Sequence, residues 1–288
     1  MKTDGPKVQG FFDAATSTVT YLVRDPGTKR AVVIDPVLDY DPVEGTLSTR
    51  SADAVLAEAA RQGLTIERVL ETHAHADHLS GARRIKDRTG ARIGAGSRMT
   101  EVQRAFAPAF GAAPDPAAFD DLFEDGASFA LGGSQVKVLH TPGHTPACVT
   151  YLIGDAAFVG DTVFMPDFGS ARCDFPGGDA RTLYRSIRRI LSHPPGTRLF
   201  VGHDYPAAAG RSKPAWETTV AEQRASNAHV SYGVSEEEFL ALRVQRDAQL
   251  KPPALLFPAL QVNIRAGLAP EPGPDGRVTF APPLKVSA

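Results

Sequence analysis

The segment Thr72-His73-Ala74-His75-Ala76-Asp77-His78 constrains this chain more than any other part of its sequence. It gathers three of the eight histidines and one aspartate into one short stretch. Side chains alternate in an extended segment, so His73 and His75 should point the same way. A turn into a following helix would let Asp77 and His78 face the same point from the first helical turn. Imidazole and carboxylate suit zinc, iron or manganese, so the segment predicts a metal site.

The composition is that of an ordinary soluble globular protein, and it argues against several classes of partner. The 288 residues are 42% hydrophobic and 22% charged, and the net charge is -2. No stripe of Lys or Arg indicates nucleic acid, and no apolar run reaches the roughly 18 residues of a membrane span. Residues 1–6 lack the apolar core of a secretory signal, and two cysteines do not form a disulfide framework. We therefore expect a cytoplasmic protein.

Hydrophobic periodicity predicts strands at first and then alternating strands and helices. The predicted strands cover residues 19–23, 31–35, 64–70, 91–93, 136–139, 148–153, 156–159 and 198–201. The predicted helices cover residues 51–62, 79–89, 179–191, 215–228 and 235–249. Residues 97–125 read as a helix and loop over one face, and a Pro-rich tail, 251–288, is expected to wrap the surface. Without a repeat or a low-complexity linker, residues 1–288 are expected to form a single domain.

Each candidate ligand follows the end of a predicted strand. The histidine-rich segment follows 64–70, and three further candidates follow later strands: His144, Asp161 and His203. Ligands that arrive from several strand ends at one rim are typical of a sandwich of sheets with outer helices. The sequence therefore predicts one shared pocket.

Four motifs together resemble the metallo-β-lactamase superfamily. They are Thr72 to His78, Thr141-Pro142-Gly143-His144-Thr145, Gly160-Asp161-Thr162 and Gly202-His203-Asp204-Tyr205, in this order. The resemblance covers roughly residues 7 to 210. It implies an α/β fold, the αβ/βα four-layer sandwich, with a metal site along one edge.

Within that superfamily, the chain more closely resembles persulfide dioxygenases, which include the bacterial β-lactamase hydrolase-like proteins. The supporting segments are residues 140–151, 169–175 and 201–205. The resemblance implies one Fe(II) per chain, held by His73, His144 and Asp161 as a facial triad. It also implies a role in sulfide metabolism, in which dioxygen and water convert glutathione persulfide to glutathione and sulfite. It further suggests a homodimer, although no interface can be read from the sequence.

Four more metal-type residues leave the number of metal ions open. His75, Asp77, His78 and His203 would complete a site for two zinc ions. With a single iron they would instead orient its ligands and waters. Both loadings use the same residues, so the sequence does not separate iron from zinc. Asp35, at the end of a strand, is expected to support the floor of the site by hydrogen bonding.

The resemblance also implies substrate-binding roles for Arg172 and Tyr205, and no catalytic residue beyond the metal site. The Arg172 guanidinium could bind a carboxylate of glutathione through two parallel hydrogen bonds. Alternatively, Arg172 forms a structural pair with Asp174. Tyr205 could equally be a core tyrosine with a satisfied hydroxyl. Cys173 lies near the proposed pocket, and an inert thiol is the better interpretation.

Two other functions compete with the dioxygenase. A zinc-dependent hydrolase of the glyoxalase II type would cleave a glutathione thioester, with Asp161 bridging two metals. Against it, residues 165–178 do not resemble the glyoxalase counterpart, and the predicted helix 235–249 carries only two arginines. A sulfur-responsive binding protein without catalysis is the other alternative, but no ligand of the motif is missing. A lactonase or a true β-lactamase fits less well.

Overall fold

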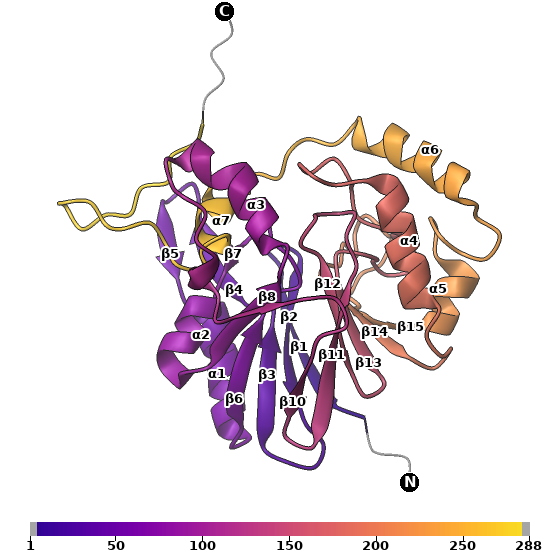
Figure 1. Cartoon of the computed structure of the whole chain (residues 1–288), viewed down its shortest axis with the longest axis horizontal. Coiled ribbons are helices and arrows are strands. Elements are labelled where there is room, and N and C mark those ends of the chain that lie inside the picture. The colour runs from indigo at the N-terminus through magenta and orange to yellow at the C-terminus, as the bar shows by residue number, and fades with distance from the viewer. Residues whose placement is uncertain (1–4, 284–288) are drawn as a thin grey trace, which may run out of the picture.

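Two six-stranded β-sheets face each other at the centre of the protein, in a computed structural model that describes residues 5–283 (Figure 1). Residues 1–4 and 284–288 lie outside the described residues. They include both ends of the predicted domain, the end of the predicted tail and most of the segment examined for a secretory signal.

The first sheet has the strand order β1-β2-β3-β6-β8-β9. Its strands are β1 (Lys7–Asp13), β2 (Thr18–Arg24), β3 (Arg30–Ile34), β6 (Thr65–Leu70), β8 (Arg92–Gly96) and β9 (Asp121–Phe123). Alternate residues of β2 serve two different cores, as the period of a strand requires. Tyr21 and Val23 pack between the two sheets, whereas Leu22 packs on the opposite face. The first sheet is therefore buried on both faces here.

The second sheet has the strand order β10-β11-β12-β13-β14-β15. Its strands are β10 (Ser128–Leu131), β11 (Ser134–His140), β12 (Val149–Ile153), β13 (Ala156–Gly160), β14 (Arg198–Val201) and β15 (Glu217–Thr219). Strands β13 and β14 run parallel, and Gly160 is paired with Val201. Both strands therefore end at the same edge of the sheet. A small third sheet consists of β4 (Val37–Asp41), β5 (Thr46–Ser48) and β7 (Leu79–Ser80).

Helices cover the outer face of each large sheet. The helices are α1 (Arg50–Arg61), α2 (Ala82–Thr89), α3 (Met99–Phe106), α4 (Ala180–Leu191), α5 (Val220–Ser226), α6 (Glu236–Asp247) and α7 (Leu256–Asn263), with short 3-10 turns at Ala107–Phe110 and Pro116–Ala118. Side chains of α1, α2 and α3 share a core with the first sheet, and those of α4, α5 and α6 share one with the second. The predicted αβ/βα four-layer sandwich is thus confirmed. Within residues 5–283, no helix has the length and apolar character needed to cross a membrane.

Two predicted helices begin later than the sequence pattern indicated. Residues 79–80 pair with β4, and the Ser80 hydroxyl accepts a hydrogen bond from the Ala82 amide at 3.0 Å, so α2 begins at Ala82. The expectation that Asp77 and His78 lie in the first helical turn was therefore wrong, because both precede β7. Residues 217–219 pair with β14, and Thr219 caps α5 in a capping box with Glu222.

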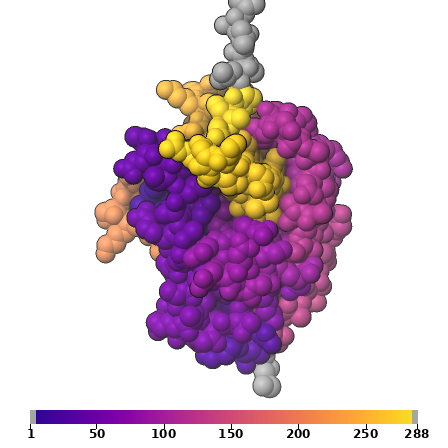
Figure 2. All heavy atoms as spheres, turned by 90° about the vertical axis from the view of Figure 1, so that its left-hand side faces the viewer, coloured from indigo at the N-terminus to yellow at the C-terminus, as the bar shows by residue number. Residues whose placement is uncertain are grey.

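The C-terminal segment contains a buried helix, although the sequence predicted a surface wrap over residues 251–288. Ala259, Leu260 and Val262 of α7 are fully buried. The helix packs against β7, the strand that follows the histidine-rich segment in the sequence (Figure 1). Figure 2 shows the C-terminal segment, in yellow, packed against the N-terminal half of the chain. The extent of the single domain stays a prediction.

Candidate metal centre

Four loops meet where β6, β11, β13 and β14 end, and these loops carry all seven candidate metal ligands. The ligand loop, residues 71–78, follows β6 of the first sheet, and the other three loops follow strands of the second. A hydrogen bond of 2.8 Å from the Val149 amide to the Thr72 carbonyl ties the two sheets together at this point. The candidate ligands therefore lie across the edge that the two sheets share.

His73, His144 and Asp161 converge on one point. Their ligand atoms all lie within 4.8 Å of one another. The Nε2 atoms of His73 and His144 each lie 3.8 Å from the same carboxylate atom, Asp161 Oδ2. His73 Nε2 is buried and has no hydrogen-bond partner within residues 5–283. A buried nitrogen without a partner is costly, so two imidazoles and a carboxylate arranged in this way fit a single Fe(II) or Zn²⁺ ion.

Hydrogen bonds fix the ring nitrogen that each histidine presents. Asp35 Oδ2 accepts a hydrogen bond from the Thr72 hydroxyl at 2.7 Å, so this hydroxyl accepts one from His73 Nδ1 at 3.0 Å. His144 Nδ1 donates to the carbonyl oxygen of Arg172 at 2.8 Å. Both rings are thereby left with an unprotonated Nε2 for a metal. Burial, together with the neighbouring histidines, also lowers the pKa of His73 well below its ordinary value.

His203 lies between two carboxylates. Its Nδ1 is 2.7 Å from Asp161 Oδ1, and its Nε2 is 2.5 Å from Asp77 Oδ2. Burial lowers the pKa of His203, but the two carboxylates outweigh burial and raise the pKa well above its ordinary value. The bond to Oδ1 holds the Asp161 carboxylate in place and leaves Oδ2 facing His73 and His144.

A second set of donors lies beside the first. Ligand atoms of His75, Asp77 and His78 also gather within 4.8 Å. His75 Nδ1 and His78 Nε2 are also buried, and neither has a hydrogen-bond partner in the part of the chain that the structure describes. Burial and the neighbouring His75 lower the pKa of His78 to about 4, so its imidazole is neutral at physiological pH. The geometry is therefore compatible with one metal ion or with two, as the sequence was.

Two buried carboxylates support the ligand loop from below. His75 Nε2 lies 3.0 Å from Asp35 Oδ1 and 3.2 Å from Glu71 Oε2. Burial lowers the pKa of His75, but Asp35 and Glu71 outweigh burial and raise it to about 10. Asp35 has a left-handed backbone with φ +49°, which aspartate tolerates better than most residues. The expected support from Asp35 is confirmed, whereas nothing in the sequence had indicated Glu71.

Two glycines allow the loops to approach one another closely. A Cβ atom on Gly160, which has φ +51°, would lie 2.4 Å from Thr72 Oγ1. A Cβ atom on Gly202 would lie 2.6 Å from Asp161 Oδ1. Only glycine leaves room for the threonine hydroxyl and the aspartate at these positions.

Arg172 is already paired within the protein. Its Nε donates to Asp174 Oδ1 at 2.5 Å, its Nη2 to Asp174 Oδ2 at 2.6 Å, and its Nη1 to the carbonyl oxygen of Lys251 at 2.7 Å. This is the structural pair that the sequence left open as an alternative. A glutathione carboxylate would have to compete with Asp174, so the substrate-binding role of Arg172 stays a prediction.

Tyr205 lies at the edge of the site, among aromatic rings. Its ring centroid is 4.8 Å from that of Phe168 and 6.0 Å from that of His203, whose ring plane is almost parallel. Burial raises the pKa of Tyr205 to about 12. The phenol is therefore neutral, and its role toward a substrate stays a prediction.

The thiols of Cys148 and Cys173 are buried and unreactive. Burial raises the pKa of each to about 12. Thiolate is the reactive form of cysteine, so neither side chain is poised for chemistry.

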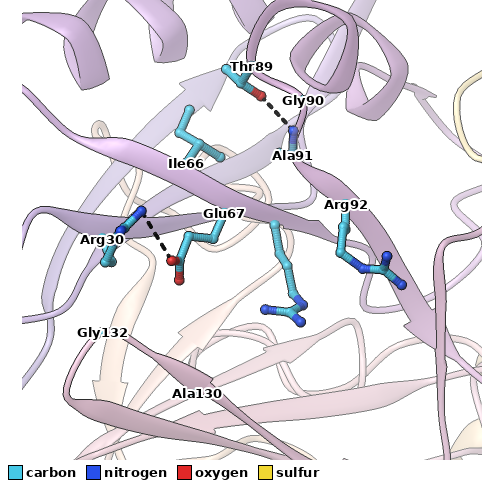
Figure 3. A pocket seen from close by; sticks show the side chains of 10 residues that line it. Arg30, Ile66, Glu67, Thr89, Gly90, Ala91, Arg92, Ala130 and Gly132 are labelled. Atoms are coloured by element: carbon cyan, nitrogen blue, oxygen red, sulfur yellow. Dashed lines mark hydrogen bonds and ion pairs between the residues drawn. The ribbon is translucent and has the colours of Figure 1, made fainter.

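A wide hollow of about 670 Å³ lies toward the start of β6 and β8, away from the candidate ligands (Figure 3). Three arginines line it, and Figure 3 shows Arg30 directed toward Glu67, at 3.5 Å. Arg68 and Arg92 are both paired with Asp121, at 3.2 and 2.8 Å. All three guanidinium groups are thus paired with carboxylates of the protein. Because none of these three arginines is left free to bind an anionic ligand, we assign no function to this hollow.

Comparison with known proteins places most of the chain in one family. A model of the metallo-β-lactamase superfamily matches residues 14–203. The β-lactamase hydrolase-like protein of Xylella fastidiosa is 50% identical over 97% of this chain, which spans 65% of that protein's length. The glyoxylase B2 of Dictyostelium discoideum is 43% identical, and the match covers 95% of each chain.

Persulfide dioxygenases are more distant relatives. The mitochondrial persulfide dioxygenase ETHE1 of Homo sapiens is 30% identical over 89% of this chain and 87% of its own. The crystal structure of ETHE1 from Myxococcus xanthus superposes with a TM-score of 0.73. It is 30% identical and covers 91% of this chain and all of the other.

Proposed function

Because this chain belongs to the metallo-β-lactamase superfamily, we propose that it is an iron-dependent persulfide dioxygenase that oxidises glutathione persulfide with dioxygen to sulfite. In this proposal, His73, His144 and Asp161 hold one Fe(II). The similarity to persulfide dioxygenases supports the reaction, and the donor set supports the metal.

The observation that carries the proposal is the shared distance to Asp161 Oδ2. Two imidazole nitrogens, from His73 and His144, lie 3.8 Å from that one oxygen. Two histidines and one carboxylate are the ligand set of non-haem iron oxygenases, so these three residues could hold Fe(II) and would leave coordination positions for substrate and dioxygen.

The overall reaction balances without another reductant. Glutathione persulfide, dioxygen and water give glutathione, sulfite and two protons. The persulfide loses four electrons in total, dioxygen accepts them, and water supplies the third oxygen of sulfite. A bound iron ion would supply the redox chemistry that this reaction needs, which zinc cannot supply.

The protein's own residues would hold the ligands and the charge in place. The Thr72 hydroxyl and the Arg172 carbonyl keep Nε2 of His73 and of His144 free of protons. His203 donates to Asp161 Oδ1 and so keeps that carboxylate anionic. Tyr205 would line the pocket for glutathione, and Arg172 would bind a glutathione carboxylate if it released Asp174.

A zinc-dependent thioester hydrolase of the glyoxalase II type is the second candidate. The additional donors, His75, Asp77 and His78, favour it because they could complete a two-metal site. The 43% identity to a protein named glyoxylase B2 points the same way.

One paired assay separates the two candidates. Apo-protein is loaded with Fe(II) or with Zn²⁺, and each form is given glutathione persulfide and, separately, a glutathione thioester. We expect oxygen uptake with the persulfide only in the iron form, and no thioester hydrolysis in either form. Thioester hydrolysis by the zinc form, with no oxygen uptake by the iron form, would overturn the proposal.

The cytoplasmic location and the homodimer stay predictions. Fractionation of the source cells and the molar mass of the protein in solution would test them. Neither result bears on the metal site.

A further inference from the structure

We propose that Asn263, near the C-terminal end of the described chain, positions the ligand loop and thereby the metal-binding histidines. This role was not predicted from the sequence, because Asn263 lies in the segment expected to wrap the surface. The inference rests on the metal centre proposed above, but not on the reaction proposed for it.

The Asn263 side chain makes its hydrogen bonds to the ligand loop and to Ser80, the last residue of β7. Its Nδ2 donates to the carbonyl oxygens of His75 and His78, both at 2.8 Å. Its Oδ1 accepts from the backbone amide of Ser80, also at 2.8 Å. Asn263 is only 4% exposed. Both N–H groups of the amide and its oxygen thus hold one short stretch of backbone.

This stretch needs such a partner, because it has little regular structure of its own. The loop lies between β6 and the two-residue strand β7. His75 and His78 are fully buried, so their backbone carbonyl groups must find hydrogen bonds within the protein. The carbonyl groups of His75 and His78, three residues apart, both accept hydrogen bonds from Asn263 Nδ2. This shared donor fixes the turn between the two residues. This turn sets the rings of His75 and His78 at 4.2 Å between centroids.

Asn263 is itself held in a rigid place. Its neighbour Ile264 accepts a hydrogen bond from Gln103 Nε2 at 2.8 Å, through the backbone carbonyl. Beyond the helix, Gly267 has φ +82° and approaches the start of α2 so closely that a Cβ atom would lie 2.9 Å from the Arg83 amide nitrogen. A side chain anchored on both sides can transmit that rigidity to the loop.

The chain offers a matched control on the same helix. Gln261 is 6% exposed, and its amide donates to the Phe257 carbonyl at 3.0 Å and accepts from the Ala281 amide at 3.0 Å. It makes no hydrogen bond to the ligand loop among the described residues. Gln261→Leu should therefore lower stability without acting on the metal site.

Cobalt(II) binding is the readout, because it reports on the site without turnover. The affinity of apo-protein for Co²⁺ is measured by competition with a chelator for the wild type, Asn263→Asp, Asn263→Leu and Gln261→Leu. Asn263→Asp keeps the oxygen that accepts from the Ser80 amide, but it replaces the donating NH2 group with an oxygen. Both hydrogen bonds to the carbonyl groups of His75 and His78 are then lost. We expect both Asn263 variants to lose about 10- to 100-fold in affinity and Gln261→Leu to stay within about twofold.

The inference fails if a folded Asn263→Leu protein binds Co²⁺ within about twofold of the wild type. If the variants do not fold, hydrogen exchange of the wild type decides. The Ser80 amide should then be strongly protected, and exchange at the rate of a free amide would overturn the inference. Failure of the dioxygenase proposal would look different, because Co²⁺ would still bind but persulfide would cause no oxygen uptake.

Discussion

Replacing Thr72 with valine tests how the protein prepares His73 for a metal ion. Valine has nearly the shape of threonine, so the close contact with Gly160 can be kept. Only the hydroxyl is lost. That hydroxyl donates to Asp35 Oδ2 at 2.7 Å and accepts from His73 Nδ1 at 3.0 Å.

The expected loss follows from these two hydrogen bonds. The bond to a charged carboxylate contributes about 1.5–3 kcal/mol, and the bond to a neutral ring about 0.5–1.5 kcal/mol. Both partners are buried, at 1% exposure for Asp35 and 2% for His73, so water does not readily replace the hydroxyl. We expect Thr72→Val to lower the free energy of unfolding of the apo-protein by about 2–4 kcal/mol. Metal affinity should fall by about 10- to 100-fold, because His73 loses the partner that fixes its tautomer.

Urea unfolding of the metal-free protein and Co²⁺ competition measure the two effects. Thr150→Val is the control, because Thr150 is equally buried and, among the described residues, its hydroxyl bonds only to that of Thr141, at 3.1 Å. The control should lose about 0.5–1.5 kcal/mol and no metal affinity. If Thr72→Val matches the control in both assays, the argument about the orientation of His73 is wrong.

Three further predictions concern the same centre and its surroundings. His144→Ala should lose most of the bound metal and the activity, because one of three protein ligands is removed; full metal content by elemental analysis would contradict the triad. Arg172→Ala should chiefly raise the Michaelis constant for glutathione persulfide, and an unchanged constant would make Arg172 purely structural. Burial, reinforced by Arg243, lowers the pKa of His229 to about 4, and His229 Nδ1 accepts from the Ser170 amide at 3.0 Å. Below about pH 6.5 this histidine is protonated in the unfolded chain but stays neutral in the folded one. The contribution of neutral His229 to the free energy of unfolding is therefore fully present above that pH and is lost as the pH falls, by about 2 kcal/mol between pH 7 and pH 5. In urea unfolding, the stability of His229→Asn should fall less between pH 7 and pH 5 than that of the wild type. An equal pH dependence in the two proteins would refute this role of His229.

The sandwich and the convergence of the ligands could be predicted because both follow from local pattern. Each candidate ligand lies in a loop that follows a strand, and the neighbouring parallel strands β13 and β14 place Asp161 and His203 at one edge. The start of α2 was misjudged, because only the pairing of Leu79 and Ser80 with β4 reveals the break before Ala82.

The supports of the site could not be predicted, because they depend on contacts between distant parts of the sequence. Asn263 lies more than 180 residues from the loop that it holds. Glu71 is near the histidines in sequence, but its contact with His75 depends on the path of a loop that has no periodic pattern. Likewise, the partner of His144 is a backbone carbonyl, which no side-chain motif encodes.

The metal content and the oxygen uptake of one preparation decide between the iron dioxygenase and the zinc hydrolase. The protein is purified under low oxygen, its metals are determined, and glutathione persulfide is added while dioxygen and sulfite are measured. We predict about one iron per chain, with one dioxygen consumed for each sulfite formed. About two zinc ions per chain, with thioester hydrolysis and no oxygen uptake, would contradict it and return His75, Asp77, His78 and His203 to a two-metal site.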